Sequence, residues 1–140
     1  MTALLEPHPL DRLQLHLDHV DRLTLGRTYG NAQPHGFTQI LYVQSGQLEI
    51  QDRTDAHVVR RNEVAIIPAG VPAAGHCPSG RRPAEILVLW CRVAIDGIDP
   101  FAGSRVMVRE QHEPAQLDAV WTQMVDYVRD NACHNDPNFR

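Results

Sequence analysis

The chain of 140 residues contains no lysine, so its 13 cationic residues are all arginines. They are scattered singly or in the pairs Arg60-Arg61 and Arg81-Arg82, and the net charge is -4. A protein that binds nucleic acid by itself needs a positive face to displace counterions from the phosphates. We therefore expect no DNA binding by this chain alone, and the absence of lysine also excludes a Schiff-base enzyme.

Cysteine is scarce, and long apolar runs are missing. Cys77, Cys91 and Cys133 form neither a CxxC motif nor a paired framework, which is typical of free thiols in a reducing compartment. No apolar run approaches the roughly 18 residues that span a membrane, and residues 1–9 lack the features of a signal peptide. The sequence predicts a cytoplasmic protein without membrane association.

Signatures of catalysis are absent as well. The chain has no GxSxG elbow, no phosphate-binding glycine loop and no HExxH helix. These absences favour a protein that is not an enzyme and that needs no cofactor.

The chain does contain short segments in which apolar and polar residues alternate, as in half-buried β-strands. Residues 13–17 alternate in this way, and residues 23–25 continue the period of two. The dense run 37–44 and the alternating segment 47–51 flank Gly46, which predicts a hairpin that bends at this glycine.

Further strands are predicted at 58–59, 64–67 and 85–95, and the segment 73–83, rich in Gly, Pro, Ser and Arg, predicts a surface loop. Short strands at regular spacing, separated by turn residues, indicate a β-barrel or a sandwich. A chain of this length can bury one sizeable core. We expect an N-terminal arm at 1–11 and a barrel at 12–112.

The period changes after Pro114, where apolar residues recur at steps of three and four. They are Leu117, Val120, Trp121, Met124, Val125 and Val128. This spacing predicts an amphipathic helix from Pro114 to Asn131. Its apolar stripe would cover the barrel of its own chain or pair with the same helix of a second chain. In the second case the partner is another copy of the chain, and we expect a homodimer through the 113–131 helix.

The segment 113–140 would also hold the start of another element. Asn135-Asp136-Pro137 places a capping residue before a proline, which favours the beginning of a further helix. We therefore expect the chain to be part of a longer protein, and the alternative is a natural terminus that frays at this point.

Two sets of residues resemble the motifs of cupin barrels. In the first motif, Gly46 matches the closing glycine, and the ligand positions before it hold Gln33, His35 and Gln39. One histidine thus remains among the metal ligands of this motif.

The second cupin motif aligns on Pro68-Ala69-Gly70. Asn62 replaces its leading glycine, and Ala73 stands where the ligand histidine would be. Gly46, Gly70 and Asn62 suit bends that need a positive φ, so the turns are kept while the ligands are lost. Metal-dependent cupins hold a divalent ion with about three histidines and a carboxylate. The resemblance therefore implies an all-β cupin-like (jelly-roll) barrel with a C-terminal amphipathic α-helix and no family-type metal site.

The order of these parts resembles the N-terminal effector-binding and dimerisation domain of AraC-type transcription regulators, over about 120 of the 140 residues. The resemblance implies a domain that binds a small-molecule effector. It also implies that DNA is bound only through a helix-turn-helix half, which this chain does not contain.

Side chains that face the barrel interior are the candidate ligand-binding residues. On the strand after Pro83, Trp90 and Arg92 share one side and would grip a planar or anionic molecule. The ordinary alternative makes Trp90 a core residue and Arg92 a rim residue. The candidate ligand-binding set is His35, Gln39, His76, Val88, Trp90 and Arg92.

Two other functions stay open. A metal-dependent cupin enzyme, a dioxygenase or an isomerase, would use His35, His76 and Cys77 as ligands. A free-standing cupin without catalytic activity would only bind a partner. The remaining histidines, at 8, 16, 19, 57, 112 and 134, have no ligand-like spacing and are expected to face solvent.

Overall fold

The computed structural model describes residues 12–26, 28–29, 33–78, 82–111 and 113–135. The predicted arm at 1–11 and the predicted helix start at 136–137 lie outside these residues. The elements are β1 (Leu13–Leu25), β2 (Thr28–Tyr29), β3 (Thr38–Ser45), β4 (Gln47–Gln51), β5 (Ala56–Arg60), β6 (Glu63–Ile67), β7 (Ala74–His76), β8 (Ala84–Ile95), β9 (Met107–Glu110) and α1 (Pro114–Asn135).

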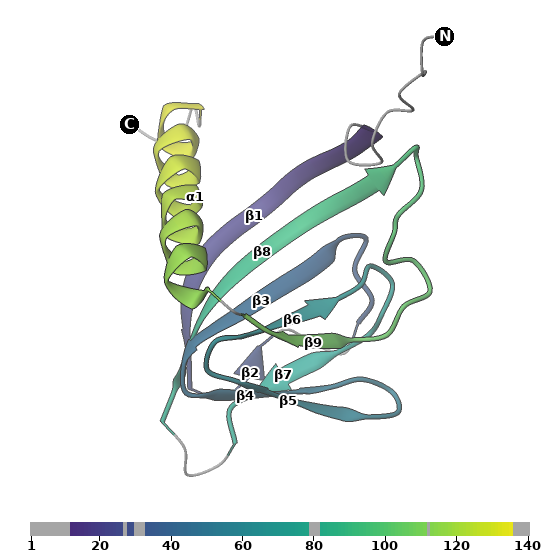
Figure 1. Cartoon of the computed structure of the whole chain (residues 1–140), viewed down its shortest axis with the longest axis vertical. Helices are drawn as coiled ribbons and strands as arrows, with labels where there is room; N and C mark the ends of the chain where they lie inside the picture. Colours follow the sequence, from purple (N-terminus) through teal and green to yellow (C-terminus); the bar gives the residue numbers. More distant parts are fainter. Residues whose placement is uncertain (1–11, 27, 30–32, 79–81, 112, 136–140) are drawn as a thin grey trace, which may run out of the picture.

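The strands form two antiparallel sheets that face each other. One sheet has the order β1-β8-β3-β6-β9, and the smaller one has the order β2-β7-β4-β5 (Figure 1). Apolar side chains of both sheets fill the space between them. Fully buried examples are Leu41, Ile67 and Ile86 from the larger sheet, and Leu48 and Ile50 from the smaller one.

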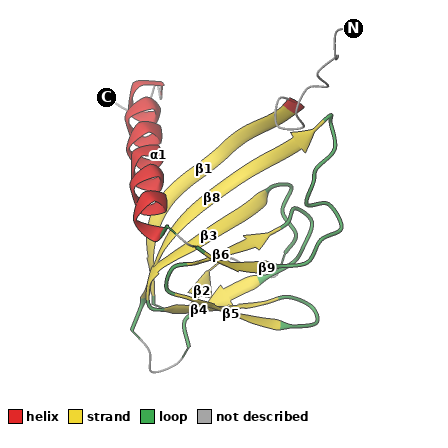
Figure 2. Cartoon of the chain, in the orientation of Figure 1, coloured by secondary structure: helices red, strands yellow, loops and turns green. Residues whose placement is uncertain are grey.

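Helix α1 covers the outer face of the larger sheet and forms a second core there. Trp121 and Val125 pack with Val20, Tyr42 and Leu87 of that sheet. The helix runs beside one end of β1, while the other end of β1 and the end of β8 extend away from it (Figure 2). The prediction of an all-β domain with a C-terminal amphipathic helix is confirmed.

The sequence left open whether the apolar stripe of α1 covers its own barrel or the helix of a second chain. In the structure the stripe lies on its own barrel. Val120 is the exception among the described stripe residues, with 51% of its surface exposed. A homodimer through the 113–131 helix stays a prediction, and it would have to use the surface of α1 that the barrel leaves open. Within the described residues, no helix has both the length and the apolar character that crossing a bilayer requires.

The predicted hairpin around Gly46 is wrong. β3 pairs with β6 and β8, whereas β4 pairs with β5 and β7, so the chain changes sheets at this bend. Gly46 has a φ of 80°, and Asn62 and Gly70 have φ values of 68° and 84°. The prediction that these three positions need a positive φ is confirmed.

The segment 73–83 is not only a surface loop, because it contains β7 and the buried residues Ala73, Gly75 and Cys77. The short strands β2 and β9 were not predicted. Two to four residues give too little alternation to reveal a strand, and these strands are fixed by their partners, β7 and β6.

A β-bulge at Asp18 changes the direction of every side chain that follows it in β1. The register with β8 shifts between Leu17 and His19. Leu17 faces Cys91 on the helix side, whereas Leu23 faces Ile86 on the interior side. The extra residue of a bulge reverses the alternation. The unbroken period of two had suggested that the leucines of 13–17 and 23–25 share a face, but the bulge places them on opposite faces.

Candidate functional site

The candidate site lies at the end of the larger sheet where β3 begins and β6 ends, while β1 and β8 pair beyond them. We call this end of the barrel its mouth. Four residues form a row across β1, β8, β3 and β6. They are His19, Trp90, Gln39 and Ile67. Beyond this row, β1 and β8 continue as a two-stranded ribbon to Leu13 and Ile95.

Aromatic rings are lined up at this mouth. His19 and Trp90 have ring centroids 4.7 Å apart, Trp90 and Phe37 are 4.8 Å apart, and Phe37 and His35 are 5.0 Å apart. The last two pairs are stacked, with interplanar angles of 20° and 18°. We call these four rings the aromatic ladder. Its members are half-buried, so the ladder offers ring edges and faces to a molecule at the mouth.

Charged groups stand next to the ladder on the ribbon. The Nε and Nη2 atoms of Arg92 donate to the two carboxylate oxygens of Asp18, at 3.2 and 3.0 Å. Nε2 of His16 lies 3.3 Å from the same carboxylate. The Asp18 bulge therefore holds a cation at the rim through a two-point contact, which fixes the direction of the guanidinium.

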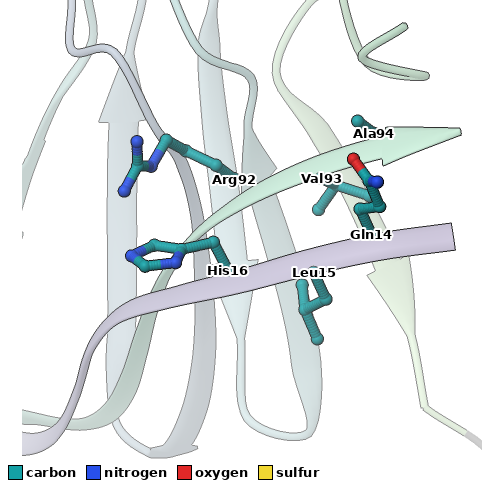
Figure 3. Close-up of a pocket in the computed structure, with 6 residues that line it drawn as sticks. All are labelled: Gln14, Leu15, His16, Arg92, Val93 and Ala94. Carbon is teal, nitrogen blue, oxygen red and sulfur yellow. The ribbon is translucent and has the colours of Figure 1, made fainter. Parts of the chain in front are cut away.

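A surface pocket of about 430 Å³ borders this rim. It is lined by Gln14, Leu15, His16, Arg92, Val93 and Ala94. Figure 3 shows His16 and Arg92 close together on one side of the ribbon, and Leu15 and Val93 on the other. The polar side continues the barrel mouth, because Arg92 follows Trp90 on the interior face of β8.

Deeper in the barrel the surroundings become apolar. Val88 is fully buried in the core, so its side chain contacts other side chains and not the open mouth. Gln39 is only 4% exposed. Its amide is therefore a polar group at the boundary between the packed interior and the aromatic ladder, where it can hydrogen-bond a ligand or a neighbour.

The two cupin-motif turns meet beside the ladder. The amide of Gly70 donates to the carbonyl of His35 at 2.8 Å, and the amide of Ala69 donates to Oγ1 of Thr38 at 3.3 Å. The turns thus lie as the motifs require, but the side chains do not suit a metal. Gln33 is exposed, Gln39 supplies an amide and Ala73 supplies no ligand atom.

The alternative ligands His35, His76 and Cys77 are not brought together. His76 lies on β7, with Nε2 3.8 Å from Glu49 on the neighbouring strand. Cys77 is buried, and its thiol donates to the carbonyl of Leu25 at 2.8 Å. Among the described residues, the group of three potential ligands that meets within 4.8 Å consists of Asp52, Asp55 and His57.

The Asp52 cluster closes the turn between β4 and β5. Oδ1 of Asp52 accepts from the amides of Thr54 and Asp55, at 2.8 and 2.7 Å, and Oδ2 lies 3.0 Å from Nε2 of His57. These bonds, above all the one from the Asp55 amide, lower the pKa of Asp52, although burial acts in the opposite direction. The Asp52 oxygens are engaged within the turn, and we assign the cluster to its stability.

Cys91 follows Trp90 on β8, but its thiol is not activated as a nucleophile. Burial raises the pKa of the Cys91 thiol, and the charges of Asp18 and Asp99 raise it further. The thiolate is the nucleophilic form, so this cysteine is inert at neutral pH.

Sequence reasoning missed two members of the site. His19 was expected to face solvent, but the bulge turns it inward onto Trp90. Asp18 was not singled out, although it fixes Arg92. A polar break in an alternating strand, followed by a return to alternation, is the signal that could have indicated a bulge here.

Together, the two facing sheets, the helix on the outer face and the cupin-type turns define a cupin-like barrel. No family model matches the chain, and no curated protein matches it in sequence. Solved structures share its fold. YhaK from Escherichia coli has a TM-score of 0.56 at 14% identity, over 70% of this chain and 44% of YhaK.

ToxT from Vibrio cholerae shares the fold as well. An apo form of ToxT from Vibrio cholerae has a TM-score of 0.55 at 9% identity, over 74% of this chain and 46% of ToxT. ToxT bound to (E)-4-(8-methylnaphthalen-1-yl)but-3-enoic acid has a TM-score of 0.52 at 13% identity, over 84% and 49%. This chain thus spans less than half the length of each protein. At these identities the likeness shows a common fold.

Proposed function

We propose that this chain is the effector-sensing domain of an AraC-type transcription regulator, and that its effector is a small carboxylic acid with an aromatic or apolar body. The observation that carries the proposal is the aromatic ladder at the barrel mouth, next to the guanidinium of Arg92, which can exchange Asp18 for a ligand carboxylate. The rings would contact the body of the ligand, and Arg92 would bind its carboxylate.

The chemistry of the mouth supports this ligand class. Trp90 and Phe37 offer apolar ring surface, and Gln39 adds one polar group behind them. ToxT, which shares the fold, has been solved with a naphthalene-bearing butenoic acid. A molecule of that kind combines the two features that the ladder and Arg92 would recognise.

β1 would carry the signal from the ligand to the helix. His19 contacts Trp90 at the mouth, and the next residue, Val20, packs in the core under α1. Nη2 of Arg22 also donates to Oγ1 of Thr122 on α1, at 2.9 Å. A ligand that shifts His19 would therefore bias the position of α1, and with it any DNA-binding domain that is joined to α1.

Trp90 can report binding directly, because the chain has only two tryptophans. In the Trp121→Phe chain, Trp90 is the sole tryptophan, and phenylbutanoic acid should change its fluorescence. The Trp90→Phe chain retains Trp121, which lies between α1 and the larger sheet, and should show little response. If the acid leaves the Trp90 signal unchanged up to its solubility limit, the mouth is not the binding site.

The role of Arg92 is tested by comparing phenylbutanoic acid with its neutral amide. Arg92→Gln should weaken binding of the acid by about tenfold, as expected for a charge-assisted hydrogen bond of about 1.4 kcal/mol, and should leave the amide unaffected. Asp18→Asn should strengthen binding of the acid, because Asp18 competes for Arg92. Arg109→Gln, at an exposed arginine of β9, is the matched control. Equal losses for acid and amide would exclude carboxylate recognition by Arg92.

A further inference from the structure

The first residues of β1 form an exposed strand edge. Among the strands that the structure describes, β1 is the last of the five-stranded sheet, and it pairs with β8 on one side. Over residues 13–17 the pairing with β8 is regular, and the segment Leu-Gln-Leu-His-Leu contains no acidic residue, arginine or proline. Natural edge strands are usually protected by charges, prolines or bulges. This stretch has none of them before the bulge at Asp18.

The two halves of β1 differ in how they are covered. Near its C-terminal end, α1 packs on Val20, and Arg22 donates to Thr122 of the helix. In the other half, Leu13, Leu15 and Leu17 are 38%, 61% and 37% exposed. These leucines lie on one face of the ribbon, together with Val93 and Ile95 across from them on β8. A strand edge with an exposed apolar row is a surface that a further strand would complete.

We propose that the β1 edge, residues 12–18, pairs with the same edge of a second copy of this chain. The two strands would run antiparallel around a twofold axis at Leu15, which would join the two five-stranded sheets into one continuous sheet. The inference does not depend on the proposed effector function.

The sequence of the edge is complementary to itself in this one register. With Leu15 opposite Leu15 of the other copy, each Leu13 lies opposite a Leu17, so all the leucines meet on one face. Each Arg12 then lies opposite an Asp18, which places opposite charges at both ends of the paired segment. A shift of two residues in either direction leaves one leucine of each copy without a leucine opposite and separates Arg12 from Asp18.

The side-chain directions agree with this pairing. Asp18 lies on the same face of the ribbon as His16 and Arg92, which it contacts. Arg12 occupies an even position before the bulge and thus belongs to that face as well, where it reaches Asp96 at 2.8 Å. The ion pairs and the leucine row would therefore occupy opposite faces of the joined sheet. A twofold interface of this kind uses one patch on both copies.

Sedimentation of the full chain over a range of concentrations tests the proposal. We expect a monomer-dimer equilibrium, and Leu15→Arg should weaken the dimer by about a hundredfold or more, since it places two like charges at the axis. Val120→Arg, at an exposed position of α1, should leave the dimer unchanged. A chain that stays monomeric at every concentration, or a dimer that is lost in Val120→Arg and kept in Leu15→Arg, would overturn the proposal.

The register is tested by exchanging charges between two chains. Arg12→Asp alone and Asp18→Arg alone should each dimerise poorly, because like charges then meet at both ends of the segment. Mixing the two variants should restore a heterodimer, since the introduced carboxylate then faces the introduced guanidinium, and the unchanged Arg12 of one chain faces the unchanged Asp18 of the other. Circular dichroism would confirm that both variants are folded before mixing. A mixture of two folded variants that remains monomeric excludes this register.

Discussion

Gly46 is restricted both by its own backbone and by a neighbouring strand. Its φ is 80°, and a Cβ atom at this position would lie 2.9 Å from the Cα atom of Ala84. Gly70 has a similar φ of 84°, but nothing lies within 4 Å of its Cβ position. Comparing alanine substitutions at these two glycines therefore separates the free-energy cost of a side chain at positive φ from the cost of a steric clash.

We expect Gly70→Ala to lower the free energy of unfolding by about 1 kcal/mol, the conformational cost of a side chain at positive φ. Gly46→Ala should cost about 2–4 kcal/mol, because overpacking against the start of β8 adds to that cost. Urea unfolding followed by circular dichroism measures both values. Equal losses would show that β8 can move away from the new methyl group.

Asp52 makes the stability of the β4–β5 turn depend on pH. Its side chain is 8% exposed, and its carboxylate accepts two backbone hydrogen bonds. Asp52→Ala should therefore cost about 1–2 kcal/mol at neutral pH. The pKa of Asp52 is lowered from its ordinary value of 3.8 by folding. The charge-dependent stabilisation is thus fully present above pH 3.8 and is lost as the pH falls toward the pKa of the folded state.

Unfolding curves of the wild type and Asp52→Ala between neutral and acidic pH test this dependence. The difference between them should stay constant down to about the ordinary carboxyl pKa and then decrease. Asp55→Ala is a control at an exposed carboxylate that lacks these bonds to Oδ1. A difference that grows on acidification would contradict the assignment.

At the scale of elements, alternation predicted most of the strands because one face of each is buried. It could not predict how strands pair. The bend at Gly46 has the composition of a hairpin, yet β3 and β4 belong to different sheets, because burial of both strands against one core determines their partners. The bulge at Asp18 was hidden for a similar reason, since an extra residue changes the register without changing the composition.

Trp121 anchors α1 on the larger sheet. It is 3% exposed, and its ring lies 6.1 Å from that of Tyr42. Within the described part of the chain, its Nε1 atom has no hydrogen-bond partner. The tryptophan therefore contributes ring volume and apolar area to this contact, but no hydrogen bond.

We expect Trp121→Ala to lower the free energy of unfolding by about 3–5 kcal/mol, as for other large core truncations. Trp121→Phe should cost about 1.5 kcal/mol or less, because it keeps an aromatic ring and leaves no polar group unpaired. Val120→Ala, one residue away and exposed, should change stability by about 0.5 kcal/mol at most. Thermal and urea unfolding distinguish the three. A large loss in Trp121→Phe would show that Nε1 does make a stabilising contact.

At the scale of the whole molecule, the sequence predicted the fold class and the position of Trp90 and Arg92, because glycine turns and strand faces are local features. It did not predict the aromatic ladder. That arrangement depends on three segments, around His19, Phe37 and Trp90, which are far apart along the chain. Only the register of β1 and β3 against β8 brings them together.

Asp18 belongs to both the candidate site and the β1 edge, which would couple effector binding to dimerisation. A ligand carboxylate that binds Arg92 competes with Asp18 for the guanidinium. The Asp18 carboxylate, released from Arg92, would then pair more strongly with Arg12 of the second copy than it does while Arg92 holds it. We therefore expect phenylbutanoic acid to strengthen the dimer by about tenfold, and the dimer to strengthen binding of the acid by the same factor, because such coupling is reciprocal.

Sedimentation with and without phenylbutanoic acid measures this coupling, and the neutral amide of the acid is the control, since it cannot displace Asp18. Arg12→Gln should remove the effect of the acid on the dimer without preventing binding of the acid. In Leu15→Arg, the affinity for the acid should no longer depend on protein concentration. If the acid binds but weakens the dimer, Asp18 pairs with Arg12 of the second copy only while Arg92 holds the Asp18 carboxylate. Effector binding would then oppose dimerisation.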